Sequence, residues 1–180
     1  MARALRELAR QIDKWQDRLG RGVSWLMLLM VAVVFSDVIL RYLFSISTVF
    51  TQEFEWYLFG VVYLMAAGYT MLYDEHVRVD IVYSRFSPRK KAWFDFVLLF
   101  VFFFPSCLLV IITAWPFVRN AFQVLEGSPD PGGIPARWAL KAVIMIGFAV
   151  LMLQGVSQAI KSFFWGMGWE RPPRLEKEIH

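Results

Sequence analysis

The stretch VSWLMLLMVAVVFSDVILRYLF at residues 23–44 decides the fold. Its 22 residues extend about 33 Å as an α-helix, and a bilayer hydrocarbon core is about 30 Å thick. The whole chain of 180 residues is 58% hydrophobic and 19% charged, against about 45–50% and 25% in ordinary soluble domains. We therefore predict a transmembrane helix here and a membrane protein overall.

Three further apolar stretches lie downstream, at residues 54–73, 93–117 and 138–165. The first two are long enough to span a bilayer. The last holds 12 clean apolar residues before Gln154, so it spans only with its flanks, and a re-entrant segment is the alternative. We predict an all-α integral membrane protein with four transmembrane helices.

Basic residues indicate the orientation of these helices. Six Lys and Arg lie in residues 1–22, five in the loop 74–92 and four from Lys161 onward. Short loops rich in Lys and Arg stay in the cytoplasm. We predict that both termini and the central loop are cytoplasmic, and nucleic-acid binding gains no support from the net charge of +4.

The leader, residues 1–22, has apolar residues at helical spacing, with charged residues between them: Leu5, Leu8, Ile12, Trp15 and Leu19. This pattern predicts an amphipathic helix in the membrane interface, followed by a turn at Gly20 to Gly22. A short coiled-coil arm is the alternative. Residues 23–165 then form the membrane domain, and residues 166–180 a cytoplasmic tail.

Polar residues inside membrane spans are costly in lipid and mark sites worth attention. Asp37 and Arg41 are four residues apart on one helix, so their side chains can pair. Glu53 and Glu55 lie where the next span begins. A cluster of Arg41 with Asp37, Glu53 or Glu55 would tie the first two helices together. The functional alternative is an ion relay that uses Asp37.

The last span has a polar stripe at intervals of three and four residues: Gln154, Ser157, Gln158 and Lys161. Such a stripe either packs against another helix through hydrogen bonds or lines a polar cavity. Small residues also recur on the second and fourth spans, where they favour close helix packing: Gly60, Gly68, Gly155 and Ala159.

The charged septet DEHVRVD at residues 74–80 holds His76, Arg78 and Asp80. With two histidines and one cysteine in the chain, we find no metal, haem or catalytic constellation and expect no cofactor. A surface helix or a strand fits residues 77–86, and Ser87 and Pro88 predict the start of the next helix. We expect four basic residues beside this segment to contact anionic lipid headgroups: Arg85, Arg89, Lys90 and Lys91.

The sequences ILRYLF (39–44), TQEFEW (51–56) and AAGYTMLYDEHVRVDIVYSRFSPRKKAWFDF (66–96) resemble the small membrane (Q-type) subunit of tripartite ATP-independent periplasmic (TRAP) transporters. The resemblance extends through nearly the whole chain, and the HVRVD signature after the second span is its most specific part. It implies a multi-pass protein of the bacterial inner membrane.

The resemblance implies a non-catalytic subunit that braces a large permease subunit. In that family a periplasmic binding protein delivers an organic acid, and the large subunit takes it up with sodium. Six residues match recurring family positions, which implies helix packing and partner contact: Arg41, Glu53, Glu55, His76, Arg78 and Asp80. Two alternatives stay open, a small oligomeric exporter that uses Asp37 as its coupling carboxylate and a membrane anchor for a redox enzyme.

The stretch EGSPDPGGIP, at residues 126–135, is rich in turn-forming residues. It lies in the outer loop between the third and fourth spans. Our hypothesis is that this loop helps to dock the binding protein.

Overall fold

The computed structural model describes residues 2–73 and 86–169. They form the helices α1 (Ala2–Phe44), α2 (Val49–Leu72), α4 (Pro88–Leu98), the π-helix η1 (Leu99–Phe103), α5 (Phe104–Gln123) and α6 (Arg137–Gly166). The segments α4, η1 and α5 follow one another without a break, so the described chain consists of four helical rods. The all-α prediction is confirmed for the described residues.

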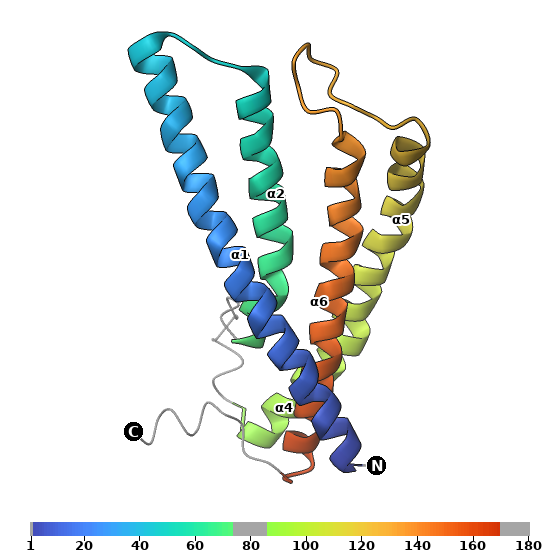
Figure 1. Ribbon diagram of the computed structural model, residues 1–180. Coiled ribbons are helices and arrows are strands. Elements are labelled where there is room, and N and C mark those ends of the chain that lie inside the picture. Colours follow the sequence, from blue (N-terminus) through green and yellow to red (C-terminus); the bar gives the residue numbers. More distant parts are fainter. Residues whose placement is uncertain (1, 74–85, 170–180) are drawn as a thin grey trace.

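The four rods pair as two antiparallel hairpins (Figure 1). The rods α1 and α2 form one hairpin, and α5 and α6 form the other. The two hairpins diverge toward the end that holds the loops 45–48 and 124–136, and they meet at the other end, where α1 begins. Helix α6 is central, because it contacts α1, α2, α4 and α5.

Helix α1 runs unbroken for 43 residues, and at about 1.5 Å per residue it is about 65 Å long, twice the thickness of the hydrocarbon core. The predicted turn at Gly20 to Gly22 is wrong. Gly20 instead lies directly under the ring of Tyr69 on α2, where no side chain fits. The leader and the membrane segment form one continuous helix. The glycine at position 20 serves the close contact with Tyr69 and does not end the helix.

The third rod contains a π-helix that the apolar pattern did not predict. The N–H of Phe104 donates to the carbonyl of Leu99, five residues earlier. Pro105 follows at once, and since proline has no N–H, it cannot continue the α-helical ladder. A local π adjustment is one way in which a membrane helix accommodates a proline. The rod begins at Pro88 with Ser87 at the N-cap position, as predicted.

Three segments in the described part of the chain are long and apolar enough to cross a membrane: Ala2–Phe44, Pro88–Gln123 and Arg137–Gly166. Helix α2 has 24 residues, which is sufficient length, but it is not among these three. Two glutamates, Glu53 and Glu55, lie in its first two turns. The span predicted at residues 54–73 stays a prediction.

The interior of the bundle is small. Val23, Val62 and Met65 form a buried apolar cluster where α1, α2 and α6 meet. Large apolar side chains cover the outward faces instead, and Trp25, Tyr63 and Leu109 are each more than 60% exposed. An exposed apolar surface of this extent is typical of a protein surrounded by lipid or by another subunit.

Candidate functional site: two polar clusters that join the helices

Asp13 on α1 is the centre of a polar cluster at the end of the bundle where α1 begins. Its carboxylate accepts hydrogen bonds from Ser157 Oγ at 2.6 Å and from Gln154 Nε2 at 3.1 Å. Lys161 Nζ lies 2.8 Å from the same carboxylate. Three residues of the predicted polar stripe on α6 therefore meet one acidic residue of α1. The stripe packs against another helix, which is the first of the two alternatives.

The fourth residue of the stripe, Gln158, lies apart from this cluster. It lines a second groove, between α2, α6 and the rod that contains η1. Met71, Asp95 and Phe103 line the same groove. The polar stripe of α6 is thus divided: three of its residues contact Asp13, and Gln158 lines the second groove.

Gln16 lies one helical turn beyond Asp13 and is fully buried, with 0% exposure. Neither polar atom of its amide has a hydrogen-bond partner among the described residues. A Cβ on Gly68 of α2 would lie 2.6 Å from Gln16 Nε2, so the glycine makes room for this amide. Buried amides without partners are energetically costly, and Gln16 marks a weak point in the α1–α2 interface.

The leader packs one face against the other helices of the bundle, and its interfacial placement stays a prediction. The structure buries Ala9, Ile12, Gln16 and Gly20 against the other helices. Of the predicted apolar face, Leu8 and Trp15 stay exposed at 45% and 44%. The small residues Ala9 and Gly20 let two helix backbones approach closely, while the larger Leu8 and Trp15 face outward.

Glu53 forms the centre of a second polar cluster, at the opposite end of the bundle. Its carboxylate accepts hydrogen bonds from Ser128 Oγ and from the backbone N–H of Ile134, the latter at 2.6 Å. Glu53 precedes the predicted span 54–73, and these two hydrogen bonds lower the pKa of its carboxyl. The hydroxyl of Ser128 is the larger cause. Glu53 therefore holds the loop 124–136 against α2.

The same loop is fixed to α6 by a second contact. Lys141 Nζ lies 2.5 Å from Glu126 Oε2 and 4.0 Å from the centroid of the Phe117 ring. Inside the loop, the N–H of Ser128 donates to the carbonyl of Ile134 at 3.0 Å. These bonds give the loop a defined shape between α2 and α6.

Asp37 and Arg41 form the predicted pair on α1, with a hydrogen bond and an ion pair between them. Asp37 is 2% exposed, whereas the side chain of Arg41 is 48% exposed. In the part of the chain that the structure describes, Glu53 bonds to the outer loop, and Glu55 Oε1 is buried without a hydrogen-bond partner. Within these residues, the pair does not extend to Glu53.

Several predicted residues lie outside the described ranges: His76, Arg78, Asp80 and Arg85. Arg89 and Lys90 stand exposed in the first turn of α4, and Lys91 follows them half-buried. Across residues 2–73 and 86–169, no group of three or more His, Cys, Asp and Glu residues is arranged to hold a metal ion.

The sequence patterns do not single out Asp13 or Ser128. Asp13 is one of the charged residues between the apolar positions of the leader, and Ser128 lies in the stretch of turn-forming residues at 126–135. The polar stripe on α6 was the available signal, because a stripe that packs against a helix requires polar partners on that helix. Asp13 is the residue of the leader that meets this requirement.

The fold and the polar clusters together define an α-helical membrane protein in which Asp13 and Glu53 join helices and the outer loop to one another. Residues 30–164 match the family model described as "Tripartite ATP-independent periplasmic transporters, DctQ component". Because this match covers more than half of the chain, the chain belongs to the DctQ family, the small subunit of TRAP transporters. No curated protein and no solved structure matches the chain significantly.

Proposed function

We propose that this chain is a non-catalytic subunit that braces the large permease subunit of a sodium-coupled TRAP transporter for an organic acid. The family supplies the class of transporter. The observation that favours bracing is that the acidic groups Asp13, Asp37 and Glu53 are all engaged in contacts within the chain. A coupling carboxylate needs access to the transported ion, whereas a brace needs rigid helices.

Exposed apolar faces support the same role. Outward side chains such as Phe35, Phe102 and Ile112 are each at least 60% exposed. Lipid covers such faces, and so does a multi-span partner, since helix association in membranes depends on close packing and not on apolarity. The bundle thus offers surface for a large membrane partner.

The loop 124–136 supports a contact with the periplasmic binding protein. Glu53 and Lys141 fix it at both ends, so it presents a preformed surface that costs little ordering entropy on binding. Deleting residues 128–134 should weaken docking of the binding protein. Unchanged docking affinity and unchanged transport would refute this role of the loop.

A pull-down from the native membrane in mild detergent tests the proposal. The tagged chain should bring down one large multi-span protein in near-equal amount, identified by mass spectrometry. Transport in reconstituted vesicles should require both proteins. A chain that is recovered only with itself, and that transports alone, would contradict the bracing role and favour the small exporter.

The substitution Asp37→Asn separates the two roles further. In a brace, it leaves Arg41 without its partner, so the variant should lose stability and recovery of the large subunit. In an exporter, the complex should still form while transport stops. Glu7→Gln is the control, because the side chain of Glu7 is 52% exposed and lies outside the loop 124–136.

A further inference from the structure

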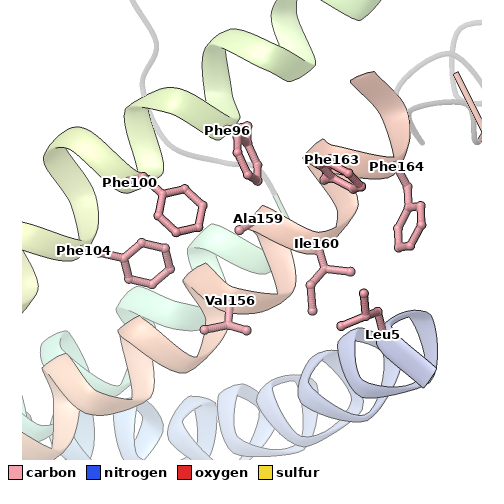
Figure 2. A pocket seen from close by; sticks show the side chains of 9 residues that line it. All are labelled: Leu5, Phe96, Phe100, Phe104, Val156, Ala159, Ile160, Phe163 and Phe164. Atoms are coloured by element: carbon pink, nitrogen blue, oxygen red, sulfur yellow. The ribbon is translucent and has the colours of Figure 1, made fainter. Parts of the chain in front are cut away.

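An open groove lies beside the end of the bundle where α1 begins (Figure 2). It has a volume of about 470 Å³. Helix α1, the rod of α4, η1 and α5, and the last turns of α6 form its walls. Every lining residue is apolar: Leu5, Phe96, Phe100, Phe104, Val156, Ala159, Ile160, Phe163 and Phe164.

The groove is elongated along the helices. Phe96, Phe100 and Phe104 form a continuous row, with neighbouring ring centroids 4.9 and 5.3 Å apart. Figure 2 shows that this row faces the side chains of Val156 and Phe163 on α6. The walls from Phe96 to Phe104 and from Val156 to Phe164 each extend over about eight helical steps, which corresponds to a length of about 12 Å along a helix.

These dimensions favour a hydrocarbon chain over a whole helix as the occupant. A volume of about 470 Å³ over a length of about 12 Å gives a cross-section on the order of 40 Å², or about 7 Å across. An α-helix with its side chains is about 10 Å wide or more. A single hydrocarbon chain fits the groove.

Basic residues mark the end of the groove near the start of α1. The guanidinium of Arg6 lies 4.8 Å from the centroid of Phe164, a lining residue. The guanidinium of Arg89 lies beside Gly168, where a Cβ would be 2.8 Å from one of its nitrogens. Trp169, the next residue, stacks on Phe164. Positive charge is thus placed at one end of an otherwise apolar groove.

We propose that this groove binds one acyl chain of an anionic diacyl phospholipid, with the headgroup phosphate near Arg6 and Arg89. The apolar row takes the hydrocarbon, and the basic end selects a negative headgroup. Charge complementarity distinguishes this occupant from a partner helix or a second copy of the chain. Leu5, at the start of α1, links the leader to the bound lipid.

Photocrosslinking tests the proposal with the full-length chain in phosphatidylcholine vesicles. The probe is a phosphatidylglycerol with a diazirine in one acyl chain. Crosslinks should map by mass spectrometry to Phe96–Phe104 and Val156–Phe164. Unlabelled phosphatidylglycerol should compete about fivefold better than phosphatidylcholine, since a basic residue near an anionic lipid contributes about this factor.

Two pairs of variants sharpen the test. Val156→Trp fills the groove and should reduce the crosslinks there about fivefold or more, whereas Ile146→Trp, at an exposed position of the same helix, should not. Arg89→Glu should abolish the preference for phosphatidylglycerol. Arg119→Glu, with the same charge change on α5 at the far end of the bundle, should leave it unchanged. Circular dichroism checks that each variant is folded.

Three results would overturn the proposal. Crosslinks spread evenly over all exposed apolar faces would mean ordinary surrounding lipid. Equal competition by the two lipids would remove the role of the basic end. Loss of the crosslinks in the co-purified complex with the large subunit would assign the groove to a protein partner. The vesicle experiment uses this chain alone, so its outcome is independent of the proposed transport function.

Discussion

At the residue scale, Asp13 connects the leader to the rest of the bundle. The side chains of Lys161 and Asp13 are only 20% and 25% exposed, so water screens their ion pair incompletely. Asp13→Asn removes the charge and leaves Lys161 half-buried without a counter-charge. We expect the free energy of unfolding to fall by about 1–3 kcal/mol, the range for a hydrogen-bonded charged group. Thermal denaturation in detergent, followed by circular dichroism, measures it.

Glu7→Gln is the matched control on the same helix. Its ion pair with Arg10 is 3.7 Å long, and both side chains are more than half exposed. Such surface pairs contribute at most about 1 kcal/mol. If Glu7→Gln and Asp13→Asn destabilise the protein equally, Asp13 has no special role in joining α1 to α6.

Glu53 gives the outer loop a dependence on pH. Its pKa in the folded protein is below the ordinary value of 4.5, so its bonds stabilise the fold fully above that value. The stabilisation is lost as the pH falls through the lower, folded-state pKa. The amide of Ile134, which donates to Glu53, should keep its protection from hydrogen exchange at about pH 6 and lose it as the pH falls through this lowered pKa.

The amide of Gly133 is the internal control for this experiment. It donates to the carbonyl of Asp130 at 3.1 Å, and a backbone carbonyl does not titrate in this range. Its protection, corrected for the intrinsic exchange rate, should change little over the same range. A parallel loss at both amides would show that the whole loop unfolds and that Glu53 is not the titrating contact.

Individual residues were predictable from the sequence where both partners lie on one helix. Asp37 and Arg41 are four residues apart, and helical geometry alone brings them together. Asp13 and Gln154 are 141 residues apart, and their contact depends on how α1 crosses α6. Helical periodicity shows which residues share a face of a helix, but it does not show which face packs against another helix.

At the scale of the helices, Gly147 on α6 sets the distance to α2. A Cβ at this position would lie 2.8 Å from Leu64 Cβ and 3.2 Å from the Leu64 carbonyl oxygen. Because a backbone atom cannot move aside alone, the two helices must separate. We expect Gly147→Ala to lower the free energy of unfolding by about 1–3 kcal/mol, as overpacked sites do.

Gly22→Ala is the control for this substitution. Gly22 lies inside α1, and nothing lies within 4 Å of the position that a Cβ would take. Alanine should therefore stabilise the helix by about 0.5–1 kcal/mol. Melting temperatures of the two variants in the same detergent should shift in opposite directions, and a shift of the same sign would contradict the packing argument.

The start of α4 was predictable from the sequence, whereas two features of helix interiors were not. Ser87 and Pro88 predict the start of α4, since proline has a strong preference for the first helical turn. The continuity of α1 was not predicted, because glycines at positions 20 and 22 indicate a turn. In the structure, Gly20 stays helical and makes room for Tyr69. The π-helix was not predicted, because an apolar run looks the same whether each backbone N–H bonds to the carbonyl four or five residues earlier.

At the scale of the whole molecule, the distribution of Lys and Arg predicts which end of the bundle faces the cytoplasm. The basic leader and the start of α4 lie at one end, and the loop 124–136 lies at the other (Figure 1). By the positive-inside bias, the loop should face the periplasm and the leader the cytoplasm. Single cysteines in a Cys107→Ser background, where the native cysteine is removed, allow this to be measured.

The two positions for the test are Asp130→Cys in the loop and Glu7→Cys in the leader, both exposed. A maleimide that cannot cross membranes should label the first in intact spheroplasts and the second only after lysis. The reverse pattern would overturn the orientation, and it would place the loop where no periplasmic protein can reach it. Labelling of both positions before lysis would show instead that residues 7 and 130 share one compartment, which contradicts three membrane crossings by α1, α2 and the rod of α4, η1 and α5.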